Sequence, residues 1–347
     1  MRVNISNNDR KRTRMTSVEA KRPAFTGREV LKIGGGVVVL TLAGVVLWAS
    51  AWDYVRWTED FLPGAAPTAV LEPEAWTVTD DSVVFAAVGD TGTGGRNQMD
   101  VAQAMVDAYA AAPYGFVAHV GDVSYSGSIL DRWEDVWARP YKSLFDAGVR
   151  FEVALGNHEL EEGQSEETLQ WIEARLQQLG YADTYRVVPY GPVDFFFLDS
   201  STPLVTGERS GEQLAWLEDV LAESTARWKV AVMHHAPYSS SLKRGSNVEL
   251  REVVEPLFIK HGVQLVLTGH DHLYERTHPQ NGVTFVVTGA GAKLSDIGRS
   301  DFTAVAEEVL QFMMIEVDGQ LMTIRAIDAT GKVFDSVTID TSGAVQP

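Results

Sequence analysis

The feature that most constrains this chain is a set of short polar motifs, each placed where an apolar stretch ends. The motifs are Gly89-Asp90 after residues 83–88, Gly121-Asp122 after 116–120, Gly156-Asn157-His158-Glu159 after 151–155, His234-His235 after 230–233, and Gly269-His270-Asp271-His272 after 263–267. Apolar runs of this length are typical of buried strands, and ligands gather at the carboxyl ends of strands in open α/β sheets. We therefore expect five loops to direct two aspartates, an asparagine and histidines toward one point.

The rest of the pattern predicts the fold class. Helical periodicity lies between several of the apolar stretches, and after residue 283 the pattern changes to a run of short strands. The dipeptide Asp318-Gly319 is typical of a hairpin turn between two of these strands. Strands that alternate with helices, followed by a run of strands, predict a layered α/β domain with mixed sheets.

Each motif alone is a weak signal. A single Gly-Asp after a strand is usually a turn or a helix N-cap, and Gly-Asn-His is usually turn chemistry. The pair His270-x-His272 is more specific, because alternate residues of an extended segment can reach neighbouring metals. The chain has no cysteine, so any metal must be held by Asp, Glu, His, Asn or Tyr. The joint occurrence of the five motifs indicates a functional site.

Together, the segments GDTG, GDVSY, GNHE, VMHH and GHDH resemble the motif set of the calcineurin-like metallophosphoesterases. The position of Tyr125, three residues after Asp122, resembles the motif pattern of the purple acid phosphatase branch of that superfamily. The segment NGVTFVVTGAGAK resembles the small tartrate-resistant type. The resemblance covers residues 83–330 and implies a four-layer α/β/β/α sandwich of two mixed β-sheets flanked by helices.

The resemblance also implies a site that holds two metal ions. Fe(III) is expected on Asp90, Asp122, Tyr125 and His272, and Fe(II), Zn or Mn on Asp122, Asn157, His234 and His270. A phenolate is a hard ligand that suits ferric iron, while an imidazole-rich site suits iron, zinc or manganese. Without the other motifs, Tyr125 would be interpreted as a core aromatic residue.

The implied function is hydrolysis of a phosphoric monoester, with a metal-bridged hydroxide that attacks phosphorus in line. Asp122 and His158 are the expected catalytic residues, and His158 would act as an acid for the leaving group. A phosphodiesterase on the same fold and a non-catalytic surface metal-binding protein are the alternatives, because the same ligands would serve both. The expected partner is a small phosphorylated substrate. The net charge of −18 disfavours nucleic acid.

One loop departs from the family pattern. Related phosphatases carry further histidines after the fourth motif, whereas this loop is SSSLKRGSNVEL, residues 239–250, and contains none. Lys243 or Arg244 could meet the phosphate instead, although solvated loop charges are the simpler interpretation. His235 is expected to point away from the metals, toward substrate or elsewhere, because the pattern selects His234 as the ligand.

The N-terminal region has a different composition. Residues 1–32 hold nine basic and three acidic residues, a net charge of +6, so the remaining residues carry −24. The charge-free run 33–52 would span about 30 Å as a helix. This pattern predicts a basic cytoplasmic leader (1–32), a transmembrane signal anchor (33–52), a stalk (53–79) and an extracytoplasmic catalytic domain (80–342). A buried core helix is one alternative. The other is a signal peptide cleaved near Ala51, which would make the protein secreted.

Overall fold

The computed structural model describes residues 31–33, 36–38, 81–125, 129–160, 184–200 and 210–346. The chain divides into two units, residues 1–60 and residues 61–347. In the first unit, strand β1 (Leu31–Ile33) pairs with strand β2 (Gly36–Val38) in antiparallel orientation.

This strand pair bears on the helix predicted over residues 33–52. Ile33 and Gly36–Val38 belong to that span, yet they lie in β1 and β2, so the prediction is wrong for these residues. The three consecutive glycines 34–36 disfavour a helix, since each costs about 1 kcal/mol relative to alanine in a helix interior. The other residues of the span and the predicted stalk lie outside the described residues. Among the described residues, no helix is long and apolar enough to cross a membrane. The membrane anchor stays a prediction.

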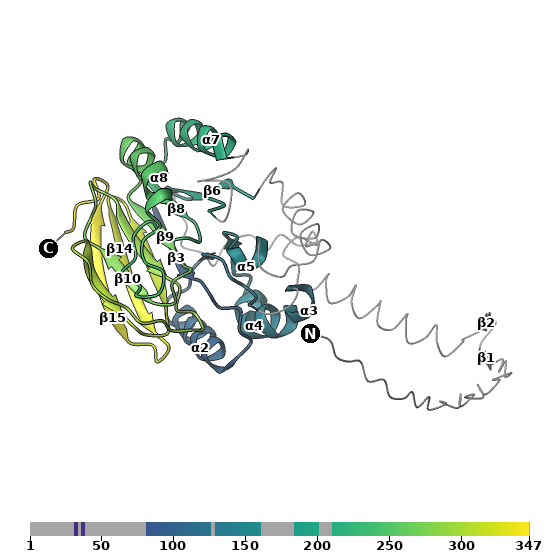
Figure 1. Cartoon of the computed structure of the whole chain (residues 1–347). Coiled ribbons are helices and arrows are strands. Elements are labelled where there is room, and N and C mark those ends of the chain that lie inside the picture. The colour runs from purple at the N-terminus through teal and green to yellow at the C-terminus, as the bar shows by residue number, and fades with distance from the viewer. Residues whose placement is uncertain are drawn as a thin grey trace, which may run out of the picture. The chain divides into compact units, whose positions relative to one another are not determined.

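Two mixed β-sheets form the second unit (Figure 1). The first has the order β15-β14-β13-β3-β4-β5 and contains β3 (Ser82–Val88), β4 (Phe116–His119), β5 (Arg150–Val153), β13 (Gln311–Asp318), β14 (Leu321–Asp328) and β15 (Val333–Asp340). The second has the order β12-β10-β11-β9-β8-β7-β6 and contains β6 (Arg186–Tyr190), β7 (Val193–Phe197), β8 (Trp228–Val232), β9 (Leu265–Thr268), β10 (Tyr274–Thr277), β11 (Thr284–Thr288) and β12 (Thr303–Glu307). Neighbours in the runs β3-β4-β5 and β7-β8-β9-β11 are parallel.

The two sheets pack face to face through one hydrophobic core, because residues two apart on a strand point to the same face. Phe85 of β3 and Phe116 of β4 each contact Phe195 of β7 edge to face, with ring centroids 4.9 Å apart. The same buried cluster contains Trp228 of β8 and Ile324 of β14. The core therefore fixes the relative position of the strand ends in the two sheets.

Helices cover the outer faces of both sheets. The helices in the described part of the chain are α2 (Arg96–Ala111), α3 (Ile129–Trp133), the π-helix η1 (Glu134–Ala138), α4 (Arg139–Asp146), α5 (Asn157–Leu160), α7 (Ser210–Glu223) and α8 (Val248–His261). Leu217 of α7 and Phe258 of α8 join a buried cluster with Ala231 of β8, and Trp137 of η1 contacts His119 of β4. In Figure 1, α7 and α8 lie on one side of the sheets and α2 and α4 on the other. The predicted pair of mixed sheets with helices is confirmed.

A buried ion pair joins the two sheets. Asp335 of β15 accepts hydrogen bonds from Arg276 Nε (2.7 Å) and Nη2 (2.9 Å), and from Tyr274 Oη (2.6 Å), both on β10. Burial alone would raise the pKa of Asp335, but the hydrogen bonds from Arg276 and Tyr274 outweigh it and lower the pKa. The Asp335 carboxylate is therefore charged in the folded protein at neutral pH.

Replacing Asp335 with alanine should lower the free energy of unfolding by about 3–5 kcal/mol, because Arg276 would stay buried without its counter-charge. Urea unfolding measures this cost. The exposed pair of Glu316 and Arg325 supplies the control, since Glu316→Ala should cost less than about 1 kcal/mol. Because folding lowers the pKa of Asp335, its contribution should be complete above about pH 4 and lost at lower pH. Equal costs for the two variants would contradict this account.

Candidate metal centre

The predicted metal-binding side chains come from loops at the ends of strands in both sheets. The loops follow β3 (Asp90), β4 (Asp122, Tyr125), β5, β8 (His234) and β9 (His270, His272), and the loop after β5 leads into α5, whose first residue is Asn157. All seven side chains lie within one network of short polar contacts. The five loops are therefore brought to one point, as expected from the strand-end motifs.

One part of the network contains Asp90, Tyr125 and His272. The Tyr125 hydroxyl donates a hydrogen bond to Asp90 Oδ1 at 3.1 Å and lies 3.0 Å from His272 Nε2. His272 Nε2 lies 3.5 Å from Asp90 Oδ1. Asp90 is fully buried, and His272 is 8% exposed. These three side chains present an oxygen, a phenolic oxygen and a nitrogen to one another.

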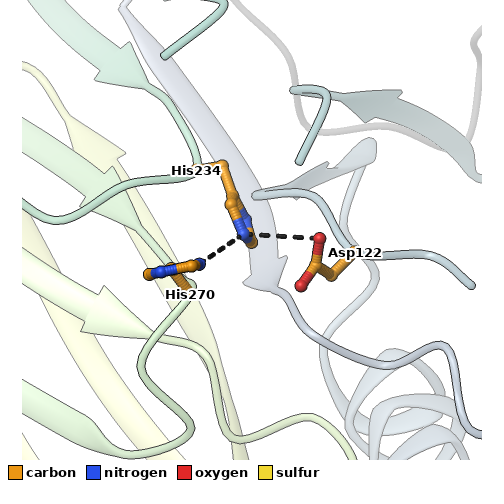
Figure 2. Close-up of side chains that lie close together, drawn as sticks. All are labelled: Asp122, His234 and His270. Carbon is orange, nitrogen blue, oxygen red and sulfur yellow. Dashed lines mark hydrogen bonds and ion pairs between the residues drawn. The ribbon is translucent and has the colours of Figure 1, made fainter. Parts of the chain in front are cut away.

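The other part contains Asp122, Asn157, His234 and His270. Asn157 Oδ1 lies 3.1 Å from His234 Nε2 and 3.0 Å from His270 Nδ1, and the two imidazole nitrogens are 3.2 Å apart. Asp122 Oδ1 lies 3.4 Å from His234 Nε2. Figure 2 shows Asp122 and His270 on either side of His234; one ligand atom from each of the three lies within 4.8 Å of the others. The backbone N–H of His270 donates to Asp90, which joins the two parts.

The backbone at the centre is strained. Asp90 and Asp122 have φ of 57° and His270 has φ of 69°, a left-handed region that non-glycine residues rarely adopt. A Cβ added at Gly156 would clash with Asp122 Oδ1, and one at Gly269 would clash with Asp90 Oδ2. These glycines let two loop backbones approach the carboxylates closely. Strain of this kind persists where the surrounding structure holds it and is frequent at functional sites.

Burial and the neighbouring charges shift the pKa values of the ionisable groups at the centre. Burial raises the pKa of Asp90 well above its ordinary value, although His234 opposes the shift. Burial alone would also raise the pKa of Asp122 and lower that of His234. Their mutual attraction outweighs it, so the pKa of Asp122 is lowered and that of His234 is raised to about 9. Carboxylate, phenol, amide and imidazole groups are the donors that first-row metals accept, so the residues fit a metal centre.

Glu159, the fourth residue of the GNHE motif, holds two of the loops together. Its carboxylate accepts hydrogen bonds from the backbone N–H groups of Asp122 (2.8 Å), Val123 (2.8 Å) and Gly156 (2.9 Å). Burial and the charge of Asp122 raise the pKa of Glu159 to about 7. Glu159 therefore links the loop that carries Asp122 to the segment that begins at Gly156.

A cavity of about 500 Å³ opens beside the centre. His158 and His235 line it together with Asn157 and His270. The ring of His158 lies edge to face with Tyr125, with centroids 4.8 Å apart, and its backbone N–H donates to Asp122 Oδ1 at 3.2 Å. His158 and His235, the two cavity-lining histidines that are not predicted ligands, therefore face the space where a substrate could bind.

Two supporting residues were absent from the sequence predictions. Ser200 Oγ accepts hydrogen bonds from the backbone N–H groups of His234 (3.2 Å) and His235 (2.9 Å). Lys293 Nζ lies 3.0 Å from the centroid of the Tyr125 ring, a cation–π contact. Ser200 follows the end of β7, so the strand-end rule could have found it. The contact of Lys293 depends on tertiary packing.

Comparison with known proteins decides the family. A sequence model described as calcineurin-like phosphoesterase matches residues 83–274. The chain belongs to the calcineurin-like phosphoesterase family. The match covers the strand ends that carry all seven predicted ligands, and it confirms the resemblance drawn from the motifs.

Individual relatives identify the branch. Purple acid phosphatase 17 of Arabidopsis thaliana is 28% identical over 239 residues, which cover 62% of this chain and 70% of that protein. Tartrate-resistant acid phosphatase type 5 of Oryctolagus cuniculus is 33% identical over 135 residues, 36% of this chain and 41% of that protein. This calcineurin-like phosphoesterase is thus a metal-dependent enzyme of the purple acid phosphatase branch.

A solved structure shares the fold. The purple acid phosphatase PPD1 from yellow lupin (Lupinus luteus) seeds superposes with a TM-score of 0.65 at 19% identity. The alignment covers 77% of this chain and 55% of the lupin chain. This chain therefore spans about half the length of the lupin protein.

Proposed function

We propose that this calcineurin-like phosphoesterase is a dinuclear-metal phosphoric monoester hydrolase. The observation that carries the proposal is the convergence of seven ligand side chains from five loops into two adjoining clusters. Asp122 comes from the same loop as Tyr125 of one cluster and contacts His234 of the other. A carboxylate in that position can join two cations.

The proposed ligand sets follow the two clusters. Fe(III) would be held by Asp90, Asp122, Tyr125 and His272, and Fe(II), Zn or Mn by Asp122, Asn157, His234 and His270. Bound cations lower the pKa of a water molecule and neutralise phosphate oxygens. The chain's own contribution is to hold the ligands in place through strained loops, Glu159 and the buried core.

His158 has the position expected of a proton donor. It lies next to the proposed ligand Asn157, lines the cavity, and packs against the Tyr125 ring. We propose that its imidazole carries a proton to the leaving oxygen of the substrate and contributes a positive charge beside the departing group. Because His158 is outside the ligand set, this role is separable from metal binding.

The substrate class is tested by comparing the rates at which the metal-loaded protein hydrolyses phenyl phosphate, a monoester, and diphenyl phosphate, a diester. A monoesterase should release phosphate from the first and leave the second largely intact. A higher kcat/KM for the bis-ester would instead support the phosphodiesterase alternative. Full metal content without turnover of either ester would support the metal-binding alternative.

Tyr125 is expected to give the iron-loaded protein a visible absorption band, because a phenolate on Fe(III) transfers charge to the metal. Tyr125→Phe should remove the band, leave the six other ligands in place, and weaken retention of that metal. Absorption spectra and iron analysis measure both effects. Tyr109→Phe is the control, since Tyr109 lies in α2 and its ring contacts that of Tyr114. An active, iron-loaded wild-type protein without a band would contradict the assignment of Tyr125.

A further inference from the structure

The cavity beside the metal centre is larger than a phosphoryl group requires. Its volume of about 500 Å³ lies in the range of sites that hold whole small molecules. It begins at the proposed ligands Asn157 and His270 and extends to Gly245, Ser246 and Asn247 of the loop that follows β8. If phosphorus is bound at the metals, the rest of the cavity receives the leaving group.

Arg244 is the only lysine or arginine among the ten described residues that line this cavity. Its Nη1 donates a hydrogen bond to the carbonyl oxygen of His270 at 2.9 Å and lies 3.8 Å from Asp271 Oδ1. Asp271 is 1% exposed, whereas the Arg244 side chain is 27% exposed. Among the described residues, the His270 carbonyl is the one hydrogen-bond acceptor of the guanidinium, which has five N–H groups. Arg244 therefore has donors left for a ligand.

The loop that carries Arg244 is fixed at both ends. Asn247 N–H donates to the Ala236 carbonyl at 2.8 Å, which closes the loop. Ser240 donates to the buried carboxylate of Glu275 through its N–H (2.6 Å) and its hydroxyl (2.7 Å). The guanidinium is thus presented by a preorganised backbone, which reduces the entropy lost when a ligand binds.

We propose that Arg244 binds a second anionic group, a carboxylate or a phosphate, on the leaving group of the substrate. This inference rests on the proposed monoesterase function. The planar guanidinium matches the geometry of either anion, and Ser246 and Asn247 continue the polar lining beyond it. The preferred substrates are small phosphorylated molecules with an additional negative charge.

The kinetic test compares phenyl phosphate with 4-carboxyphenyl phosphate, which differ by one carboxylate. Arg244→Ala should raise KM for the carboxylated ester by about 10- to 100-fold, the scale of a hydrogen bond to a charged group. The KM for phenyl phosphate should change by less than about threefold. Arg244→Lys should recover part of the loss. Lys243→Ala, which removes an exposed charge from the same loop, is the matched control and should have little effect on either ester.

A binding test is independent of turnover. Calorimetric titration of the metal-loaded protein with 3-phosphonopropionate and with propylphosphonate measures preference for the second anion. The wild-type protein should favour 3-phosphonopropionate, and Arg244→Ala should lose that preference with unchanged metal content.

Equal losses for both esters would place Arg244 on the transferred phosphoryl group and overturn the proposal. So would a preference that survives in Arg244→Ala. If no ester is hydrolysed at full metal load, the proposed function fails, while the binding titration still decides the role of Arg244.

Discussion

Asp122→Asn should reduce phosphatase activity by a factor of about 10³ or more and cost the protein at least one metal ion. A neutral amide cannot replace a carboxylate that joins two cations, because it lacks the negative charge and one strong donor oxygen. Asparagine is the informative replacement. It tolerates the left-handed φ of 57° at this position, so the loop backbone can keep its conformation.

Metal analysis and phosphate release from phenyl phosphate, measured on the same preparation, check this expectation. Asp301→Asn is the matched control, because Asp301 is exposed in the turn that precedes β12. It should retain both metals and the wild-type rate. An Asp122→Asn protein with full metal content and a near-normal rate would contradict the assignment of Asp122 as a ligand shared by two metal ions.

His158→Ala should lower kcat by about 10²- to 10⁴-fold, the usual contribution of a positioned acid or base. Both metals should stay bound, because His158 contacts Asp122 through its backbone N–H, which alanine keeps. The effect should be largest for substrates with poor leaving groups, since these depend most on proton donation.

The comparison of phenyl phosphate with 4-nitrophenyl phosphate makes the role of His158 specific. A proton donor predicts a greater loss for phenyl phosphate, whose leaving group is more basic. His278→Ala, which removes an exposed histidine directly after the end of β10, should change neither rate. An equal loss on both esters, or loss of metal from His158→Ala, would indicate a structural role for His158.

The strand-end motifs predicted much of the fold and the composition of the site. The apolar runs at residues 83–88, 116–120 and 230–233 correspond to β3, β4 and β8, because buried strands require continuous apolar residues. Glycine followed by a polar residue marked the loops that carry Asp90 and Asp122. Motif order could therefore be used to predict which side chains meet.

Features that depend on partners distant in the sequence could not be predicted in this way. Strand β10 contains the buried charged residues Glu275 and Arg276. Glu275 accepts a hydrogen bond from Ser240, and Arg276 donates one to Asp335. The sequence of β10 therefore lacks the apolar pattern of a buried strand. The contact between Lys293 and Tyr125 joins segments far apart in the chain. At residues 33 and 36–38, length and lack of charge favoured a helix, whereas the structure has paired strands.

The most direct test of the central proposal is the number of metal ions bound per chain. The purified full-length protein, loaded with iron and zinc and freed of excess metal, should contain two metal ions per chain and hydrolyse phenyl phosphate. Stepwise removal by a chelator should abolish activity as the first of the two is lost. Full activity with a single metal ion per chain, or with none, would contradict the dinuclear account.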